Sequence, residues 1–239
     1  MKKTVILILL ALTTKGYSQF TKSMFSKDPI INLETWQKQR LYFGYYLGFN
    51  SYDFKIDYKS YEKINQDIQV KKTTGFNVGV VADLRLMEYI NLRFEPGLYY
   101  TKRDLYFPDP EFTSKTDYLR EVSSTYINFP LLLKFSSLRT GNIRPYLLGG
   151  VSTTLNLSSN AKSIDDNLEQ RFRVKAWTMN YELGFGIDFF SEYFIFSPSI
   201  RGSFGINDEL IRDKDPNSPW TGNIESIKSR AILINFTFH

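Results

Sequence analysis

The sequence predicts an all-β fold, an eight-stranded antiparallel transmembrane β-barrel. Three observations support this prediction: an N-terminus typical of exported proteins, segments in which apolar residues alternate with small or polar ones, and an aromatic content of 16%. A membrane-spanning helix needs about 20 consecutive, mostly apolar residues, and no stretch after the N-terminal region has them. An aromatic-rich exported chain of this kind is typical of a barrel.

The N-terminal 18 residues have the three parts of a secretory signal peptide. Two lysines near the start precede an apolar run at 4–12, and the small residues Gly16 and Ser18 stand before the expected cleavage point. The following 22 residues are polar and weakly helical. The sequence thus predicts three regions: a signal peptide at 1–18, a periplasmic lead-in at 19–40, and the barrel at 41–239.

Period-2 alternation predicts the strands, because successive side chains of a strand point to opposite faces. In 177–189, apolar residues occupy every second position from Trp177 to Phe189, while Asn180 and Glu182 stand between them. The last such segment ends in Phe236, Phe238 and His239. The eight predicted strands are 41–50, 75–84, 89–100, 126–135, 144–157, 177–189, 194–206 and 232–238.

The connections between these strands alternate in length, which is typical of outer-membrane barrels with short periplasmic turns and longer outer loops. Both termini are therefore expected in the periplasm. A secreted β-sandwich is the soluble alternative, but strand length, loop alternation and the aromatic last strand favour the barrel. The short connections are 85–88, 136–142 and 190–192, and the long ones are 51–74, 101–123, 158–175 and 207–225.

Composition excludes several functional classes. The chain has no cysteine, so disulfides and thiolate chemistry are excluded. The net charge of +5 falls to +2 when the signal takes away three lysines, and no basic run favours nucleic acid. The one histidine, His239, is the last residue, which argues against a catalytic triad or a histidine metal site. We therefore expect no enzyme activity, no catalytic, metal or cofactor site and no small-molecule substrate.

Charged residues at inward positions predict a filled lumen, because an eight-stranded barrel is just wide enough for side chains. Four acids and three bases nearly cancel, which favours a hydrogen-bonded plug that satisfies buried charges. A proton relay or a catalytic carboxylate pair is the alternative. The predicted lumen network consists of Asp83, Arg93, Glu95, Lys134, Glu182, Asp188 and Arg201.

Two loop segments are candidates for contact with a partner. Residues 213–222 combine two prolines, turn-forming residues and a tryptophan, and 106–112 has a similar character. Stiff loops with an aromatic anchor suit protein contact, although a packed surface loop without a partner is the alternative. The candidate contact residues are Tyr106, Phe107, Asp213, Pro216, Pro219 and Trp220.

Strands and loops together resemble the PorT/SprT family of the Bacteroidetes, from about Lys38 to His239. The segments that carry the resemblance are IQVKKTTGFNVGVVADLR, NLRFEPGLYYTKRDL, STYINFPLLLKFS, PYLLGGVSTTLNLSSN, YELGFGIDFF, FSPSIRGSFGINDELIRD and DPNSPWTGN. The loop segments INDELIRD and DPNSPWTGN are the most specific among them.

The resemblance implies a role in the type IX protein secretion system, which exports cargo proteins across the outer membrane and, in gliding species, motility adhesins. The implied partners are outer-membrane lipid and other type IX secretion proteins. The family offers no catalytic motif to transfer. A surface-binding, adhesin-like barrel without a secretion role is the alternative; an outer-membrane enzyme and a pore are weaker candidates.

Overall fold

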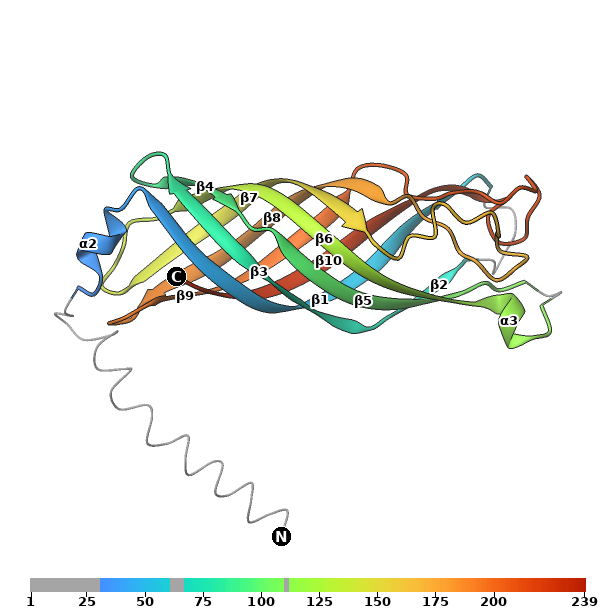
Figure 1. Cartoon of the computed structure of the whole chain (residues 1–239), viewed down its shortest axis with the longest axis horizontal. Helices are drawn as coiled ribbons and strands as arrows, with labels where there is room; N and C mark the ends of the chain where they lie inside the picture. The colour runs from blue at the N-terminus through green and yellow to red at the C-terminus, as the bar shows by residue number, and fades with distance from the viewer. Residues whose placement is uncertain (1–30, 61–66, 110–111) are drawn as a thin grey trace, which may run out of the picture.

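The computed structural model describes residues 31–60, 67–109 and 112–239. The expected signal peptide and the first part of the lead-in lie outside these residues. The described chain forms an elongated, closed antiparallel barrel (Figure 1). None of its helices is long and apolar enough to span a membrane.

The described residues form two short helices and ten strand segments. Each helix has a single turn. In chain order the elements are α2 (Glu34–Gln37), β1 (Leu41–Tyr58), β2 (Gln69–Lys72), β3 (Thr74–Arg85), β4 (Ile90–Phe94), β5 (Gly97–Tyr106), α3 (Lys115–Tyr118), β6 (Leu119–Ser136), β7 (Ile143–Asn156), β8 (Trp177–Phe190), β9 (Ile195–Gly205) and β10 (Ile224–Phe238).

The ten segments make a ring of eight strands, which confirms the predicted fold class. Segments β4 and β5 keep one register against β3 and against β6, so they form one strand interrupted around Pro96, which has no N–H to donate. Segment β2 continues β3 after a one-residue shift at Thr73. The ring closes because β1 pairs with both β3 and β10.

Pairing in the last strand extends to the last residue of the chain. The backbone N–H of His239 donates to the carbonyl of Ile195, and the His239 carbonyl accepts from the Ile195 N–H, both at 3.1 Å. The C-terminus therefore lies at the end of the barrel that carries α2 and the short turns (Figure 1). We call this the turn end, and the opposite end, with α3 and the long connections, the loop end.

The outer face of the barrel wall is apolar along β8. On β8, the outward side chains of Trp177, Met179, Tyr181, Leu183 and Phe185 are 45% to 58% exposed, whereas the inward side chains between them are buried or nearly so. An aqueous surface does not tolerate such a continuous apolar wall, but a bilayer requires one.

The strands are longer than predicted at the loop end. Strand β1 runs to Tyr58 rather than to residue 50, β6 begins at Leu119 rather than at 126, and β10 begins at Ile224 rather than at 232. We call this part the loop section and the rest of the barrel the membrane section. The loop section comprises residues 52–60, 67–73, 101–109, 112–124, 157–175 and 207–229.

The end of the lead-in covers the turn end. The backbone N–H of Asn32 donates to the Asn142 side chain at 3.0 Å, and its side-chain amide donates to the carbonyl of Phe190 at 3.1 Å. The Arg139 guanidinium donates to the carbonyl of Asn32 at 2.6 Å and lies 3.8 Å from the centre of the Phe190 ring. Residue 32 is thus attached to the barrel rather than separate from it.

Candidate functional site

The first candidate region is the interior of the membrane section, where five charged side chains form one chain of ion pairs. Arg93 on β4 bonds Asp83 at 2.9 Å and Glu95 at 3.1 Å. Arg201 on β9 donates to Glu95 at 2.8 Å and forms an ion pair with Glu182 at 3.0 Å. All five are at most 2% exposed. Each of the three carboxylates in this series of ion pairs therefore has a cation beside it.

A second ionic cluster lies nearer the turn end. The Lys134 ammonium bonds both carboxylate oxygens of Asp188, at 2.7 and 2.8 Å, and Arg144 bonds the same carboxylate at 2.9 Å. The Ser197 hydroxyl donates to Asp188 at 2.7 Å. The Lys134 nitrogen also lies 4.1 Å from the centre of the Tyr146 ring. The buried carboxylate thus accepts from three side chains, each on a different strand.

The structure places all seven predicted lumen residues inside the barrel. Adding Arg144, which the sequence analysis did not include, gives four acidic and four basic side chains, so the formal charges balance. In the part of the chain that the structure describes, no group of three or more His, Cys, Asp or Glu side chains could hold a metal ion. The geometry fits a structural plug, because the cation beside each carboxylate offsets the free-energy cost of burying its charge.

Tyrosine side chains fill the lumen on the loop-end side of the ion pairs. The Tyr46 and Tyr99 hydroxyls lie 3.1 Å apart, and Tyr46 donates to the carbonyl of Glu95 at 3.3 Å. A Cβ atom at Gly97 would overlap the Tyr46 hydroxyl, so glycine is needed where the ring meets the wall. The cavity beside Lys134 measures only about 20 Å³, which holds roughly one water.

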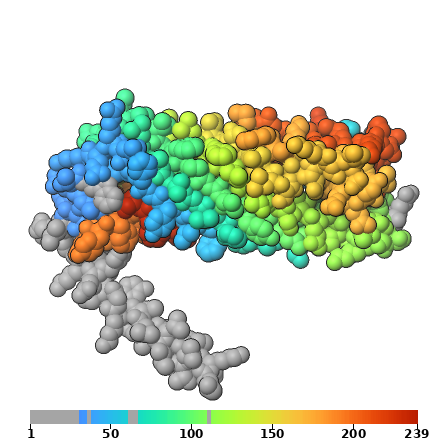
Figure 2. All heavy atoms as spheres, in the orientation of Figure 1, coloured from blue at the N-terminus to red at the C-terminus, as the bar shows by residue number. Residues whose placement is uncertain are grey.

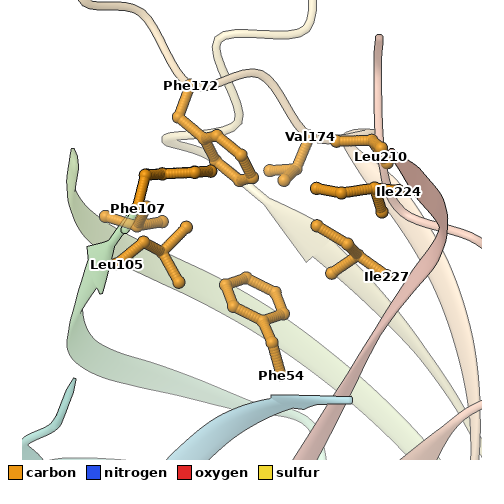
Figure 3. Packing of buried hydrophobic residues seen from close by; sticks show 9 residues of the cluster. Phe54, Leu105, Phe107, Phe172, Val174, Leu210, Ile224 and Ile227 are labelled. Carbon is orange, nitrogen blue, oxygen red and sulfur yellow. The ribbon is translucent and has the colours of Figure 1, made fainter. Parts of the chain in front are cut away.

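The second candidate region is the loop section, which has an apolar core (Figure 3). The core joins strands β1, β5, β6 and β10 to the three connections that follow β5, β7 and β9. Beneath it, the Arg103 guanidinium carbon lies 3.7 Å from the centre of the Phe54 ring, and the guanidinium donates to Ser229 at 3.2 Å and to the Tyr126 hydroxyl. The core residues are Phe54, Leu105, Phe107, Val122, Phe172, Val174, Leu210, Ile224 and Ile227.

The candidate contact aromatics have partners within the molecule. Phe107 is only 3% exposed in the apolar core, and Tyr106 stacks on Tyr118. The Trp220 ring stacks on Phe112 at 5.3 Å and its N–H donates to a carbonyl of α3 at 2.8 Å. The expectation that Phe107 and Trp220 are exposed anchors therefore does not hold, because both are needed to pack the loop section.

The other candidate residues divide into a half-buried acceptor and two exposed prolines. The Asp213 carboxylate accepts from Asn167 at 2.9 Å and from Thr221 at 2.9 Å, so it joins two long connections. Pro216 and Pro219 are exposed. In space-filling form the connections lie packed side by side at the loop end (Figure 2). Only the prolines of the predicted set are fully open to a partner.

The sequence analysis missed Arg144, Arg103 and Tyr126. Arg144 stands at an inward position of its strand, so strict alternation carried back to the strand's first residues finds it. Arg103 was assigned to a loop, and its inward neighbours Thr101 and Leu105 give no polar pattern. Only the extended length of β5 reveals its position.

Comparison with protein families decides the class of this chain. Residues 18–210 match the model of the family described as "Outer membrane protein beta-barrel domain". The chain belongs to this family. It is accordingly an outer-membrane protein, and lipid is the environment of its apolar wall. No curated protein matches the chain.

Several solved structures are similar to this outer-membrane barrel at low identity. The outer membrane protein OprG from Pseudomonas aeruginosa is 14% identical, with a TM-score of 0.45 over 84% of this chain and 97% of that one. Neisserial surface protein A is 9% identical, with a TM-score of 0.43 over 81% and 95%. AlkL is 13% identical, with a TM-score of 0.41 over 90% and 92%.

Proposed function

We propose that this protein is a non-enzymatic component or assembly factor of the type IX protein secretion system. It is needed for export of cargo proteins and, in gliding species, of motility adhesins. Support comes from the likeness of seven segments to the PorT/SprT family of the Bacteroidetes. Two of them, 206–213 and 215–223, belong largely to the loop section, where generic barrel patterning does not dictate sequence.

The filled lumen is the observation that carries this role. Ion pairs from Asp83 to Glu182 and the tyrosines around Tyr46 occupy the interior of the membrane section. A protein cannot pass through such a barrel, so a secretion role must be exercised from its outer surface. The barrel supports export by contact with other type IX proteins rather than as the channel.

The proposal includes an orientation. We place the turn end in the periplasm and the loop end outside the cell, as is usual for barrels with short periplasmic turns. The lead-in, which reaches the barrel at Asn32 and Asn142 on the turn end, is consistent with a periplasmic N-terminus. Cleavage after residue 18 remains part of this proposal. The exposed Pro216 and Pro219 then face the cell exterior, where they are available to partners.

Gene deletion in the native host tests the proposal. Loss of the gene should abolish the appearance of cargo proteins in the medium, and the wild-type gene should restore it. The amounts of unrelated outer-membrane barrels, measured in the same membranes, control for general damage. A deletion strain that secretes cargo normally contradicts the proposed role.

A surface-binding, adhesin-like barrel is the second candidate, and the size of the loop section favours it. This section has nine apolar residues in a core of its own, more than connecting loops alone require. Affinity capture from solubilised outer membranes separates the two functions. Secretion proteins in the captured fraction support the first, and extracellular ligands without them support the second.

A further inference from the structure

One edge of the loop section lacks a partner strand. Strand β6 pairs with β5 throughout residues 119–128, but its pairing with β7 begins only at Tyr126 and Asn156. The last bond on that side joins the N–H of Leu157 to the carbonyl of Thr125 at 2.9 Å. Beyond it, no described strand pairs with this side of β6.

Alternation along the strand shows which backbone groups face the open side. Thr125 bonds toward β7, so Ser123 and Glu121 point the same way, since every second residue of a strand bonds to the same neighbour. Leu119 is already satisfied: its N–H donates to Lys115, and its carbonyl accepts from the Arg120 guanidinium at 3.0 Å. The open groups are therefore the N–H and carbonyl of Glu121 and of Ser123.

A cavity of about 390 Å³ lies along this edge, between β6 and the connection that follows β7. Glu121 and Ser123 line one side, and Asn160 and Arg171 line the other. Phe172 contributes an apolar wall that continues into the loop-section core (Figure 3). The cavity thus offers room beside the strand, and both polar and apolar surface for alternate side chains.

The cavity lining carries more positive than negative charge. Its cations are Lys115, Arg120 and Arg171, of which the first and last are exposed. Its one acid, Glu121, is already bonded to Lys102 at 2.8 Å. An incoming chain with carboxylates would find unmatched positive charge, whereas a basic chain would be repelled.

We propose that the open edge of β6 binds an extended acidic segment of a partner protein as an added strand. Backbone bonds to Glu121 and Ser123 would supply affinity, and the cations would select acidic side chains. Strand addition of this kind uses an exposed sheet edge that has pockets for alternate side chains. The site holds whether or not the partner belongs to a secretion system, so it goes beyond the proposed function.

Peptide binding to the purified full-length barrel in lipid nanodiscs tests the site. The probe is a fluorescein-labelled TEVEVET peptide, and the charge-reversed TKVKVKT peptide is its control. We expect the acidic peptide to bind about tenfold more tightly or better, as measured by fluorescence anisotropy. Absence of binding up to about 1 mM, or equal binding of both peptides, overturns the proposal.

Substitution at Ser123 separates strand addition from simple charge attraction. Ser123→Pro removes one open N–H and blocks the edge, but leaves the bonds to β5 intact because this N–H faces away from β5. The Ser123→Pro variant should bind the acidic peptide about tenfold more weakly than the wild type does. The Ser123→Ala variant should bind it as tightly as the wild type. Equal affinity in Ser123→Pro, with the barrel shown folded by its heat-dependent gel mobility, contradicts the proposal.

Charge reversal at the opposite wall gives a second readout. Arg171→Glu should weaken binding of TEVEVET and strengthen binding of TKVKVKT, because it reverses one charge of the cavity lining. An unchanged preference between the two peptides contradicts the proposed recognition of acidic segments. The secretion assay on the deletion strain does not depend on this peptide measurement, so either proposal can fail alone.

Discussion

The membrane section and the loop section use the same strands with opposite polarity. On β1, Phe49 points outward and is 55% exposed, while its inward neighbour Asn50 is buried. A few residues on, Phe54 points inward and is buried, while the outward Lys55 is exposed. The barrel wall is continuous across this change, but the side chains on its two faces have exchanged their character.

The surroundings explain this exchange. Apolar side chains leave water for whichever apolar phase is nearest, the lipid in one section and the barrel interior in the other. Polar side chains then occupy the remaining face, and those inside need partners. The exchange marks the lipid boundary on the loop-end side near Asp53, which forms ion pairs with Lys72 at 3.0 Å and with Arg230 at 2.8 Å.

The largest effect is expected from breaking the polar interior of the membrane section. Arg93→Met leaves Asp83 and Glu95 without one of their cations, which should lower the free energy of unfolding by about 4 kcal/mol. Urea unfolding in lipid vesicles, followed by tryptophan fluorescence, measures it. Arg171→Met, at an exposed site, is the control and should change little. A loss below about 1 kcal/mol would mean that the pairs add no stability.

The apolar core of the loop section should respond locally. Leu105→Ala removes a fully buried side chain and should cost about 3 kcal/mol. Because the membrane section keeps its own contacts, amide hydrogen exchange should accelerate in the loop section and stay unchanged on β8. Equal acceleration in both sections would show that they unfold as one unit.

A smaller loss is expected from crowding the tyrosines that fill the lumen. Gly97→Ala forces the Tyr46 ring to move and should cost about 2 kcal/mol. Tyr46→Phe in the same chain removes the overlapping hydroxyl, so the two substitutions together should cost less than the sum of their separate effects. Additive losses in urea unfolding would disprove the contact.

The smallest effect is a pH dependence confined to the loop section. Burial raises the pKa of Glu209, although the N–H and hydroxyl of Ser229 bond its carboxylate. The folded state then binds the proton more tightly than the unfolded chain, whose pKa is 4.5, so stability should fall as pH rises from 4.5 through the folded pKa.

Amide hydrogen exchange in the loop section, measured from pH 4.5 to 8 and corrected for its intrinsic pH dependence, checks this sign. Glu209→Gln keeps an acceptor but cannot ionise, so its loop section should show a flatter profile. A wild-type loop section that becomes more stable over this range contradicts the assignment.

The same exchange of polarity explains what the sequence could predict. In the membrane section, apolar and polar positions alternate in one phase. The strands and the seven lumen charges can therefore be predicted by assigning alternate residues to the outer and inner faces. Beyond Ser51 the phase inverts, so a search for outward apolar residues ends the strand at residue 50 although β1 continues to Tyr58. Phe107 was assigned to a surface loop for the same reason.

Other features depend on contacts between distant segments, which the alternation of residues along one strand cannot predict. The partners of Trp220 are Phe112 and α3, more than 100 residues earlier in the chain. The open edge of β6 depends on where β7 ends, at Asn156, while β6 starts at Leu119. Pairing between distant segments fixes both, and local periodicity carries no information about it.

The position of the loop-section core has a kinetic consequence. Strand β1 meets β10 across 193 residues of sequence, between Tyr45 and Phe238, and pairings so distant form slowly. Phe54 from β1 and Ile227 from β10 share the core, so it assembles only after the two strands have met. Contacts formed after the rate-limiting step slow unfolding without speeding folding. The core therefore slows the reopening of the barrel between β1 and β10 once the barrel has closed.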